Sequence, residues 1–262
     1  MRVDLVIAAY NSGQALEDLV ASARSHCRCE VRVRLFLHSE HAPTVASCER
    51  VAETDGVIYH AFGQNRGLSR SWNDGILDAY ADGSDVVIVV NDDIRFGEGN
   101  VDTIAACAMQ LRDRYIISCA GWHLLHSRVL PSHGFACFAI NPIALEVIGC
   151  FDENFFPAYC EDQDYARRAY LAGLPEGNCA DTAIVHAGSA TIRRDQTLAH
   201  HNQRTQGENM HYYRRKWGGD PGDEQFAQPF GDPGLGVFIS PERRHRPYGV
   251  HDRSERDPAD TR

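Results

Sequence analysis

Short apolar runs and amphipathic stretches alternate along the first half of the chain. Four runs rich in β-branched or large apolar residues predict strands at Val3–Ala8, Val31–Leu37, Val57–Ala61 and Val86–Ile94. Three stretches between them predict helices at Gln14–His26, Thr44–Thr54 and Ser69–Ala81. Strands that alternate with helices form βαβ units with right-handed crossovers. This half of the chain therefore predicts a parallel sheet within a nucleotide-binding type of α/β fold.

The second half is less regular. Further strands are predicted at Ile116–Ala120, Phe135–Ile140 and Ala183–His186. Further helices are predicted at Val101–Arg112, Pro142–Ile148, Glu161–Ala172 and Gly207–Trp217. Pro and Gly become frequent after Trp217, and from Pro241 onward mixed charge with few large apolar residues predicts a disordered tail.

Composition narrows the class of protein. With 262 residues, 43% of them hydrophobic, the chain can bury the core of one large α/β domain. The formal charge of −10 argues against non-specific binding to a polyanion. Basic residues nevertheless cluster at Arg193-Arg194, Arg214-Arg215-Lys216 and Arg243-Arg244-His245-Arg246, so a local anionic partner stays open.

Neither the N-terminus nor the cysteines indicate export. The first residues lack the pattern of a signal peptide, and no apolar run approaches the ~18 residues of a membrane span, so a cytoplasmic protein is expected. The nine cysteines show no metal-like pairing, because Cys27 and Cys29 are only two positions apart and the others are isolated. Reduced thiols that serve as small buried side chains are the expectation.

The stretch VVIVVNDDI, Val86 to Ile94, runs directly into an amide and two carboxylates. A strand that is apolar on both faces fits the interior of a parallel sheet, where its last residues reach the ligand-binding crevice. Asp92 and Asp93 would need a cation there. The alternative is an Asn-Asp turn, because these side chains hydrogen-bond their own backbone.

A second acidic group opens the predicted helix in FDENFFPAYCEDQDYARRAYLAG, Phe151 to Gly173. Glu161 and Asp162 fall in its first turn, where the helix dipole stabilises carboxylates, so helix capping explains them as well as catalysis does. Asp164 and Arg168 are four positions apart and can pair on one face of the helix.

The ordered series AAYNSG, NRGLSRSWNDGI, VVNDDI, GFACFAI, FDENFFPAYCEDQDYARRAYLAG and VHAGSAT resembles family 2 of the glycosyltransferases. The resemblance covers roughly residues 1 to 190. It implies the GT-A fold, a Rossmann-like three-layer α/β/α arrangement around a mostly parallel sheet. On this basis residues 1–218 are expected to form the enzyme domain, with a nucleotide-sugar half at 1–115 and an acceptor half at 116–218. Residues 219–240 would be a Pro/Gly-rich extension before the tail at 241–262.

The resemblance also implies a metal and a base. Asp93 occupies the place that holds Mn²⁺ or Mg²⁺ in the family, and His186 matches a histidine that completes the metal shell or contacts the diphosphate; a polar residue that merely ends a strand is the alternative. Asp162 matches the general base, with Glu161 orienting the base or the acceptor. Trp122 and Asp164 are expected on the acceptor side.

Donor contacts follow from the same resemblance. The residues expected to bind the nucleotide sugar are Ala8, Tyr10, Asn11, Asn65, Arg66, Gly67, Asn91 and Asp92. Relatives often end the second strand with an Asp that reads uracil, whereas this chain has His38-Ser39-Glu40. The donor is therefore open among UDP-, dTDP- and GDP-sugars.

The sequence thus predicts a metal-dependent, inverting transfer of a sugar to a hydroxyl. The expected acceptor is a glycan, a small molecule or, because HYYRRKWGGDPGDEQFAQPF resembles bacteriophage-encoded members of the family, a hydroxymethylated base in DNA. A nucleotidyltransferase and a non-catalytic nucleotide-sugar binder are the alternatives. The first usually carries a Gly-rich, basic phosphate loop that AAYNSGQALED lacks.

Overall fold

The computed structural model describes residues 1–114, 117–125, 128–131, 135–186 and 196–248. Its strands are β1 (Arg2–Ala9), β2 (Glu30–Leu37), β3 (Val57–Ala61), β4 (Val86–Asn91), β5 (Ile94–Phe96), β6 (Ile117–Leu125), β7 (Arg128–Pro131), β8 (Cys137–Ile140) and β9 (Gly177–His186). They form one sheet in the order β3-β2-β1-β4-β8-β6-β9-β5, with β7 beside β6. Strands β1 to β4, β6 and β9 run in one direction, and β5, β7 and β8 run in the other.

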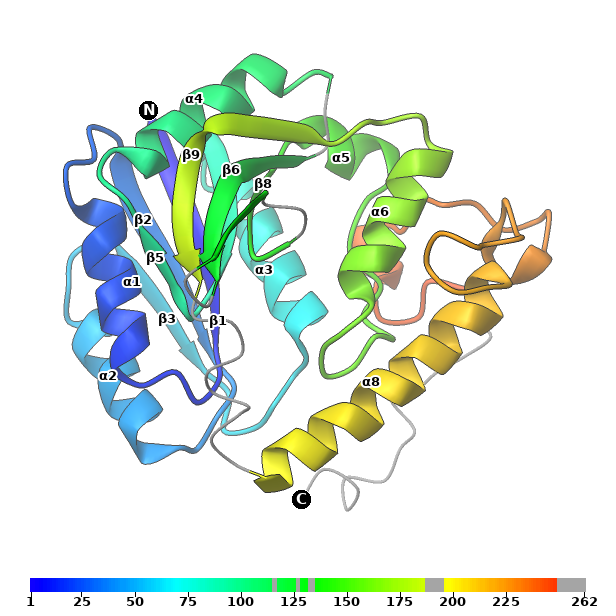
Figure 1. Ribbon diagram of the computed structural model, residues 1–262, viewed down its shortest axis with the longest axis horizontal. Coiled ribbons are helices and arrows are strands. Elements are labelled where there is room, and N and C mark those ends of the chain that lie inside the picture. The colour runs from blue at the N-terminus through cyan, green and yellow to red at the C-terminus, as the bar shows by residue number, and fades with distance from the viewer. Residues whose placement is uncertain (115–116, 126–127, 132–134, 187–195, 249–262) are drawn as a thin grey trace.

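Helices cover both faces of this sheet (Figure 1). They are α1 (Gln14–Arg24), α2 (Ala42–Ala52), α3 (Leu68–Ala81), α4 (Asn100–Leu111), α5 (Pro142–Val147), α6 (Glu161–Leu171) and α8 (Gln196–Trp217), with short 3₁₀ turns η1 (Pro229–Gly231) and η2 (Pro241–Arg243). Helices α1, α2 and α4 pack on one face, and α3, α5 and α6 pack on the other. The predicted three-layer α/β/α architecture is confirmed.

The alternation of side chains along β1 explains the two cores. Val3, Leu5 and Ile7 point toward α1, α2 and α4, whereas Val6 lies in the core beneath α3. Successive residues of a strand face opposite sides of the sheet, so a strand covered on both sides is apolar except where a buried polar group is paired, as Asp4 is with Arg32 and Arg34. The largely apolar runs that predict β1 and β4 therefore reflect burial on both faces.

Helix α3 approaches the sheet very closely at Gly75. A Cβ atom at this position would lie 2.5 Å from Cγ1 of Val6 and 3.0 Å from the ring of Phe36. The side-chain amide of Asn73 fixes the same helix, because it accepts the backbone N–H of Phe151 at 2.8 Å and donates to the Phe151 carbonyl at 3.0 Å. Both residues hold α3 in place, which sets the position of the loop at its N-terminus.

Several elements differ from the sequence-based prediction. Strands β5 and β7 were not predicted, since they are only three and four residues long. Strand β9 begins at Gly177, six positions before the predicted start at Ala183, because its pairing with β6 overrides the weak strand preference of Gly-Asn-Cys-Ala-Asp. Helix α8 begins at Gln196 and continues through Gly207, where a helix start was predicted.

The C-terminal segment also corrects a prediction. Residues 241–248 are not a disordered tail: Tyr248 is buried in a small cluster with Cys150 and Ile239, and Arg244 forms ion pairs with Asp74 and Glu153. These contacts are long-range, so the local composition does not reveal them. Residues 249–262 lie outside the described part of the chain. Within that part, no helix combines the length and apolarity needed to cross a membrane.

Candidate active site

The carboxyl ends of the parallel strands gather the predicted donor-binding residues at one edge of the sheet. Ala8 on β1 pairs directly with Asn91, the last residue of β4. The next residues of each strand, Tyr10-Asn11 and Asp92-Asp93, continue past the same edge. In open α/β sheets this edge is where ligands bind.

Sheet pairing brings Asp93 and His186 together. Ile94 of β5 is paired with His186 at the end of β9, which places the imidazole beside the residue that precedes Ile94. The Nε2 atom of His186 lies 3.1 Å from Oδ1 of Asp93, and both side chains are mostly buried. These are the two residues predicted to hold a metal.

Asp92 adds a second carboxyl group next to that of Asp93. One of its carboxylate oxygens, Oδ2, accepts the backbone N–H of Tyr10 at 2.7 Å. Burial, together with the charge of Asp93, raises the pKa of Asp92 to about 7. Two adjacent, desolvated carboxylates would be relieved by a cation at this edge.

The donor set fits the cation that the resemblance implies. Mn²⁺ and Mg²⁺ prefer carboxylate oxygens, accept imidazole less readily, and usually take their other ligands from water and substrate phosphates. Asp93 and His186 offer one oxygen and one nitrogen, which leaves the remaining positions for a diphosphate and water. A bound cation would act as a Lewis acid that neutralises charge on the leaving diphosphate.

Hydrogen bonds connect the ends of β1 and β2 to the start of α3. Ser39 donates to Oδ1 of Asn11 at 2.5 Å. His38 accepts the backbone N–H of Arg66 at Nδ1, 3.1 Å away, so its Nε2–H is left to donate to Ser71 at 2.6 Å. Burial lowers the pKa of His38 to about 4, which keeps the ring neutral. His38 is therefore a buried link between the end of β2 and the start of α3, with both ring nitrogens engaged within the protein.

The predicted donor residues 65–67 form a tight turn here. The side chain of Asn65 accepts the backbone N–H of Gly67 at 2.9 Å. Gly67 has a positive φ of 88°, and a Cβ there would meet the ring of Phe156 at 2.9 Å, so only glycine fits. Arg66 stacks on Phe62 at 4.1 Å and lies 3.6 Å from Asp74. The side chains of Asn65 and Arg66 are thus both already engaged within the protein.

The loop before α6 lies at the same edge. The backbone N–H of Leu68, the first residue of α3, donates to the carbonyl of Pro157 at 2.7 Å. From the other side, the amide of Asn209 on α8 donates to the carbonyls of Ala158 and Tyr159 at 2.7 and 3.1 Å. Both contacts fix the loop beside the start of α3, and α6 begins directly after it.

Glu161 and Asp162 open α6 after a strained approach. Tyr159 and Cys160 both have positive φ, 83° and 69°, a conformation that non-glycine residues adopt mainly where function or packing enforces it. Burial, with the charge of Asp162 added, raises the pKa of Glu161 to about 8, and its Oε2 is buried without a hydrogen-bond partner. Burial also raises the pKa of Asp162, which remains partly exposed. A partly exposed carboxyl with a raised pKa suits a general base.

Asp164 does not have the acceptor role that the sequence predicts. Its side chain is fully buried: Oδ2 accepts from Arg168 at 2.9 Å, and Oδ1 accepts from Trp217 at 2.9 Å and lies 2.6 Å from Lys216 Nζ. Lys216 also binds Asp152 at 2.8 Å. The spacing of four residues on a helix predicted the pair of Asp164 with Arg168. The contacts of Asp164 with α8 become visible only in the tertiary structure.

Three residues that the sequence analysis missed support the start of α6. Asn209 holds the loop, and Lys216 on α8 pairs with Asp152 in the segment before α6 and with Asp164 on α6. The one available signal was that Lys216 is the only lysine in the chain. Trp122 lies on β6, paired in register with Ala183, but its side chain is outside the described part of the structure.

Comparison with known proteins gives a family match for the first part of the chain. Residues 4–120 match the model of glycosyl transferase family 2. A galactofuranosyl glycosyltransferase of Leishmania donovani is 37% identical over 57 residues, which cover 22% of this chain and 13% of that protein. The chain thus matches only a small part of this curated relative.

Two solved structures share the fold. One is the mannosyltransferase PcManGT from Pyrobaculum calidifontis in complex with GDP-Man and Mn²⁺, with a TM-score of 0.55 at 18% identity, covering 77% of this chain and 63% of that one. The other is S. aureus TarS 1-349 in complex with UDP, with a TM-score of 0.55 at 14% identity, covering 82% of this chain and 72% of that one. Residues 4–120 thus match glycosyl transferase family 2, and the chain shares its fold with these two solved structures.

Proposed function

We propose that the chain transfers a sugar from a nucleoside-diphosphate sugar to a hydroxyl, with inversion, and that Asp93 and His186 hold the Mn²⁺ or Mg²⁺ it needs. The observation that carries this proposal is the 3.1 Å approach of His186 to Asp93 at the carboxyl edge of the sheet. The GDP-Man and Mn²⁺ bound to the Pyrobaculum mannosyltransferase, and the UDP bound to TarS, support a nucleotide-sugar donor and a divalent cation.

Asp162 would act as the general base. In a single displacement the acceptor oxygen forms a bond to the anomeric carbon while the bond from that carbon to the diphosphate oxygen breaks. Asp162 takes the hydroxyl proton, and the nucleoside diphosphate leaves with the bonding electron pair. Glu161, with its unpartnered buried oxygen, would orient the acceptor or the base.

The donor would lie across the ends of β1 and β4. Ala8, Tyr10 and Asn11 would contact the nucleoside, Asn91 the ribose, and Asp92 would hold the Tyr10 backbone in place. The turn formed by Asn65, Arg66 and Gly67 closes the same edge. In this scheme residues 1–115 are the nucleotide-sugar half and residues 116–218, with Trp122, the acceptor half.

A glycan or another small hydroxyl compound is the acceptor that the charges favour. To bind the phosphates of hydroxymethylated DNA, the protein would need accessible basic side chains. Lys216, however, is fully buried, Arg214 pairs with Asp220, and Arg244 pairs with Asp74 and Glu153. Arg193 and Arg194 lie outside the described residues. Part of the basic charge clustered in the sequence is therefore buried or neutralised by ion pairs within the fold.

A donor-by-acceptor screen tests the proposal. Purified protein with Mn²⁺ or Mg²⁺ is offered UDP-, dTDP- and GDP-sugars, first without an acceptor, and release of the nucleoside diphosphate is measured. Slow hydrolysis of one donor that is lost in Asp93→Ala supports the proposal, and equal turnover in Asp93→Ala overturns the metal role. Release of pyrophosphate from a nucleoside triphosphate and a sugar phosphate would instead indicate a nucleotidyltransferase.

The acceptor and the stereochemistry are then read from the products. Glycans, small hydroxyl compounds and hydroxymethylpyrimidine DNA are compared with the preferred donor, and the mass of each product is measured. The anomeric proton signal in the NMR spectrum of the product distinguishes inversion from retention. Transfer to DNA would fall steeply with added salt, because counterion release drives such binding.

A further inference from the structure

A second group of metal-type ligands lies at the opposite edge of the sheet. Cys27 and Cys29 are on the turn between α1 and β2, next to the amino end of β2. Their sulfur atoms and a carboxylate oxygen of Asp102, on α4, all lie within 4.8 Å of one another. All three side chains are partly exposed, and neither thiol is in a disulfide.

Asp102 adds a third possible metal ligand beside the two cysteines, whose spacing in the sequence does not by itself indicate a metal site. Its Oδ1 accepts the backbone N–H of Cys29 at 3.0 Å and the thiol of Cys27 at 3.2 Å, and its Oδ2 accepts the backbone N–H of Arg28 at 2.8 Å. The two backbone N–H contacts can be explained as a means of holding the turn against α4. Holding the turn does not require a thiol at the positions before and after Arg28.

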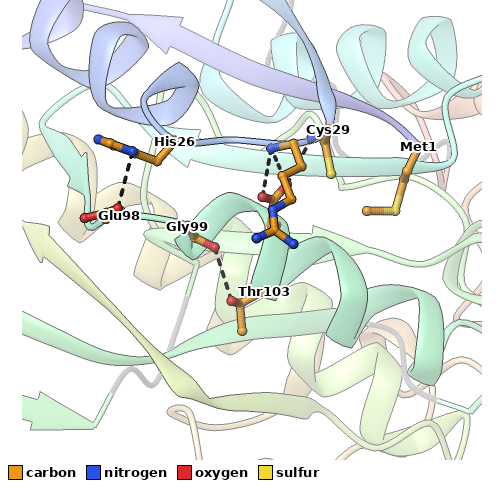
Figure 2. A pocket seen from close by; sticks show the side chains of 8 residues that line it. Met1, His26, Cys29, Glu98, Gly99 and Thr103 are labelled. Carbon is orange, nitrogen blue, oxygen red and sulfur yellow. Dashed lines mark hydrogen bonds and ion pairs between the residues drawn. The ribbon is translucent and has the colours of Figure 1, made fainter.

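The cluster borders a cavity. A space of about 590 Å³ is lined by Cys29, Asp102, His26, Glu98 and Thr103, among others. Figure 2 shows Cys29 on the segment that leads into β2 and, across from it, Gly99 just before α4 and Thr103 in the first turn of that helix. His26 is directed to Glu98, with Nδ1 and Oε1 3.3 Å apart. Water in this open pocket can therefore reach Cys29 and Asp102, which line it.

We propose that Cys27, Cys29 and Asp102 bind a soft divalent cation of the zinc class, with water from the cavity as the fourth ligand. Zinc binds thiolate at about 2.3 Å and carboxylate at about 2.0–2.2 Å in a tetrahedral shell, so one ion can span ligand atoms within the observed separation. Binding would replace the two thiol protons: the cation and two thiols give a metal dithiolate and two released protons.

This site would select a different metal from the active site. Thiolates favour zinc-class cations, whereas Mn²⁺ and Mg²⁺ favour oxygen ligands such as Asp93. The ion would tie the turn after α1 to the first turn of α4, two segments that are 75 residues apart in the chain. Its expected effect is on stability, because a ligand that binds only the folded protein stabilises it.

Titration with Co²⁺ in a reducing, thiol-free buffer is the test. One equivalent of Co²⁺ should produce a thiolate-to-cobalt charge-transfer absorption in the near ultraviolet, which Zn²⁺ then abolishes by displacement. Carboxylate and imidazole ligands give no such band, so Asp93 and His186 cannot imitate it. The double variant C27S/C29S should lose the band, and C107S, which removes another partly exposed thiol on α4, should keep it.

A second measurement on the unaltered protein guards against misfolding of the double variant. Zn²⁺ should protect Cys27 and Cys29 from alkylation by a maleimide, as read by mass spectrometry of the peptide that contains them. It should also raise the melting temperature of the wild type and of C107S but not of C27S/C29S. Absence of the band in the wild type, an unchanged band in C27S/C29S, or alkylation that Zn²⁺ does not slow would each overturn the proposal.

Discussion

The imidazole of His186 lies 3.1 Å from the carboxylate of Asp93, although the two residues come from the end of β9 and from the turn between β4 and β5. The antiparallel pairing of Ile94 with His186 creates this contact. If the pair holds the catalytic cation, Asp93→Asn should lower the transfer rate by about a hundredfold or more, since a Lewis-acid metal contributes several kcal/mol.

The measurement for Asp93→Asn is the initial rate of nucleoside diphosphate release across a Mn²⁺ titration. The matched control is Arg95→Gln, which changes an exposed charge on β5 two positions away. A rate for Asp93→Asn equal to that of Arg95→Gln would show that the cation, if needed, binds elsewhere.

Asp162→Asn should remove the general base while leaving donor binding intact. General-base catalysis contributes about 10² to 10⁴ in rate, so transfer should fall within that range. Donor affinity, followed by calorimetric titration, should stay within about twofold of the wild type, because the amide has nearly the shape of the carboxylate. Gln163→Ala, an exposed neighbour on the same helix, is the control. Undiminished transfer in Asp162→Asn would favour a mechanism without an enzymatic base.

Glu161 should make stability fall as pH rises. Burial raises its folded-state pKa from 4.5 to about 8, so between these values the folded protein holds a proton that the unfolded chain has released. The stability that comes from this protonated carboxyl is complete below about pH 4.5 and is lost as pH rises through about 8. Urea denaturation of Glu161→Gln should show a weaker decline with pH over this interval than the wild type does. Parallel curves would mean that Glu161 ionises normally.

Replacing Lys216 should greatly lower the free energy of unfolding. This lysine is fully buried between Asp152 and Asp164, so Lys216→Met would leave both carboxylates without this cation. Breaking a buried ion pair on one side costs about 3–5 kcal/mol. The control is Arg204→Met on the same helix, whose exposed pair with Glu208 contributes at most about 1 kcal/mol. Equal denaturation midpoints for the two variants would contradict this assignment.

Gly75→Ala and Gly207→Ala should change stability in opposite directions. At Gly75 the new methyl group would meet Val6 at 2.5 Å, and overpacking of this kind costs about 1–3 kcal/mol. At Gly207, within α8, no atom lies within 4 Å of the new position, so the higher helix propensity of alanine should stabilise the protein by up to about 1 kcal/mol. Thermal melts of both variants measure the difference, and a raised melting temperature in both would show that the backbone at Gly75 can yield.

The sequence by itself determined the elements whose burial follows a regular pattern along the chain. The apolar run Val86–Val90 indicated a strand covered on both faces, and the period of Glu161–Leu171 gave α6 and its internal pair of Asp164 with Arg168. It also placed Asn91 and Asp92 at a strand end, because the polar residues begin where the apolar run stops. Local periodicity carries this information, so no partner needs to be known.

Only the tertiary structure decided which distant groups meet. The contact of Asp93 with His186, the buried position of Lys216 and the cluster of Cys27, Cys29 and Asp102 each join segments from different parts of the chain. Strand β9 shows the same limit, since its first residues have weak strand preference and are held by pairing with β6. Sequence patterns report which face of an element is buried, but the identity of its neighbours depends on strand order and register, which are fixed when the whole sheet assembles.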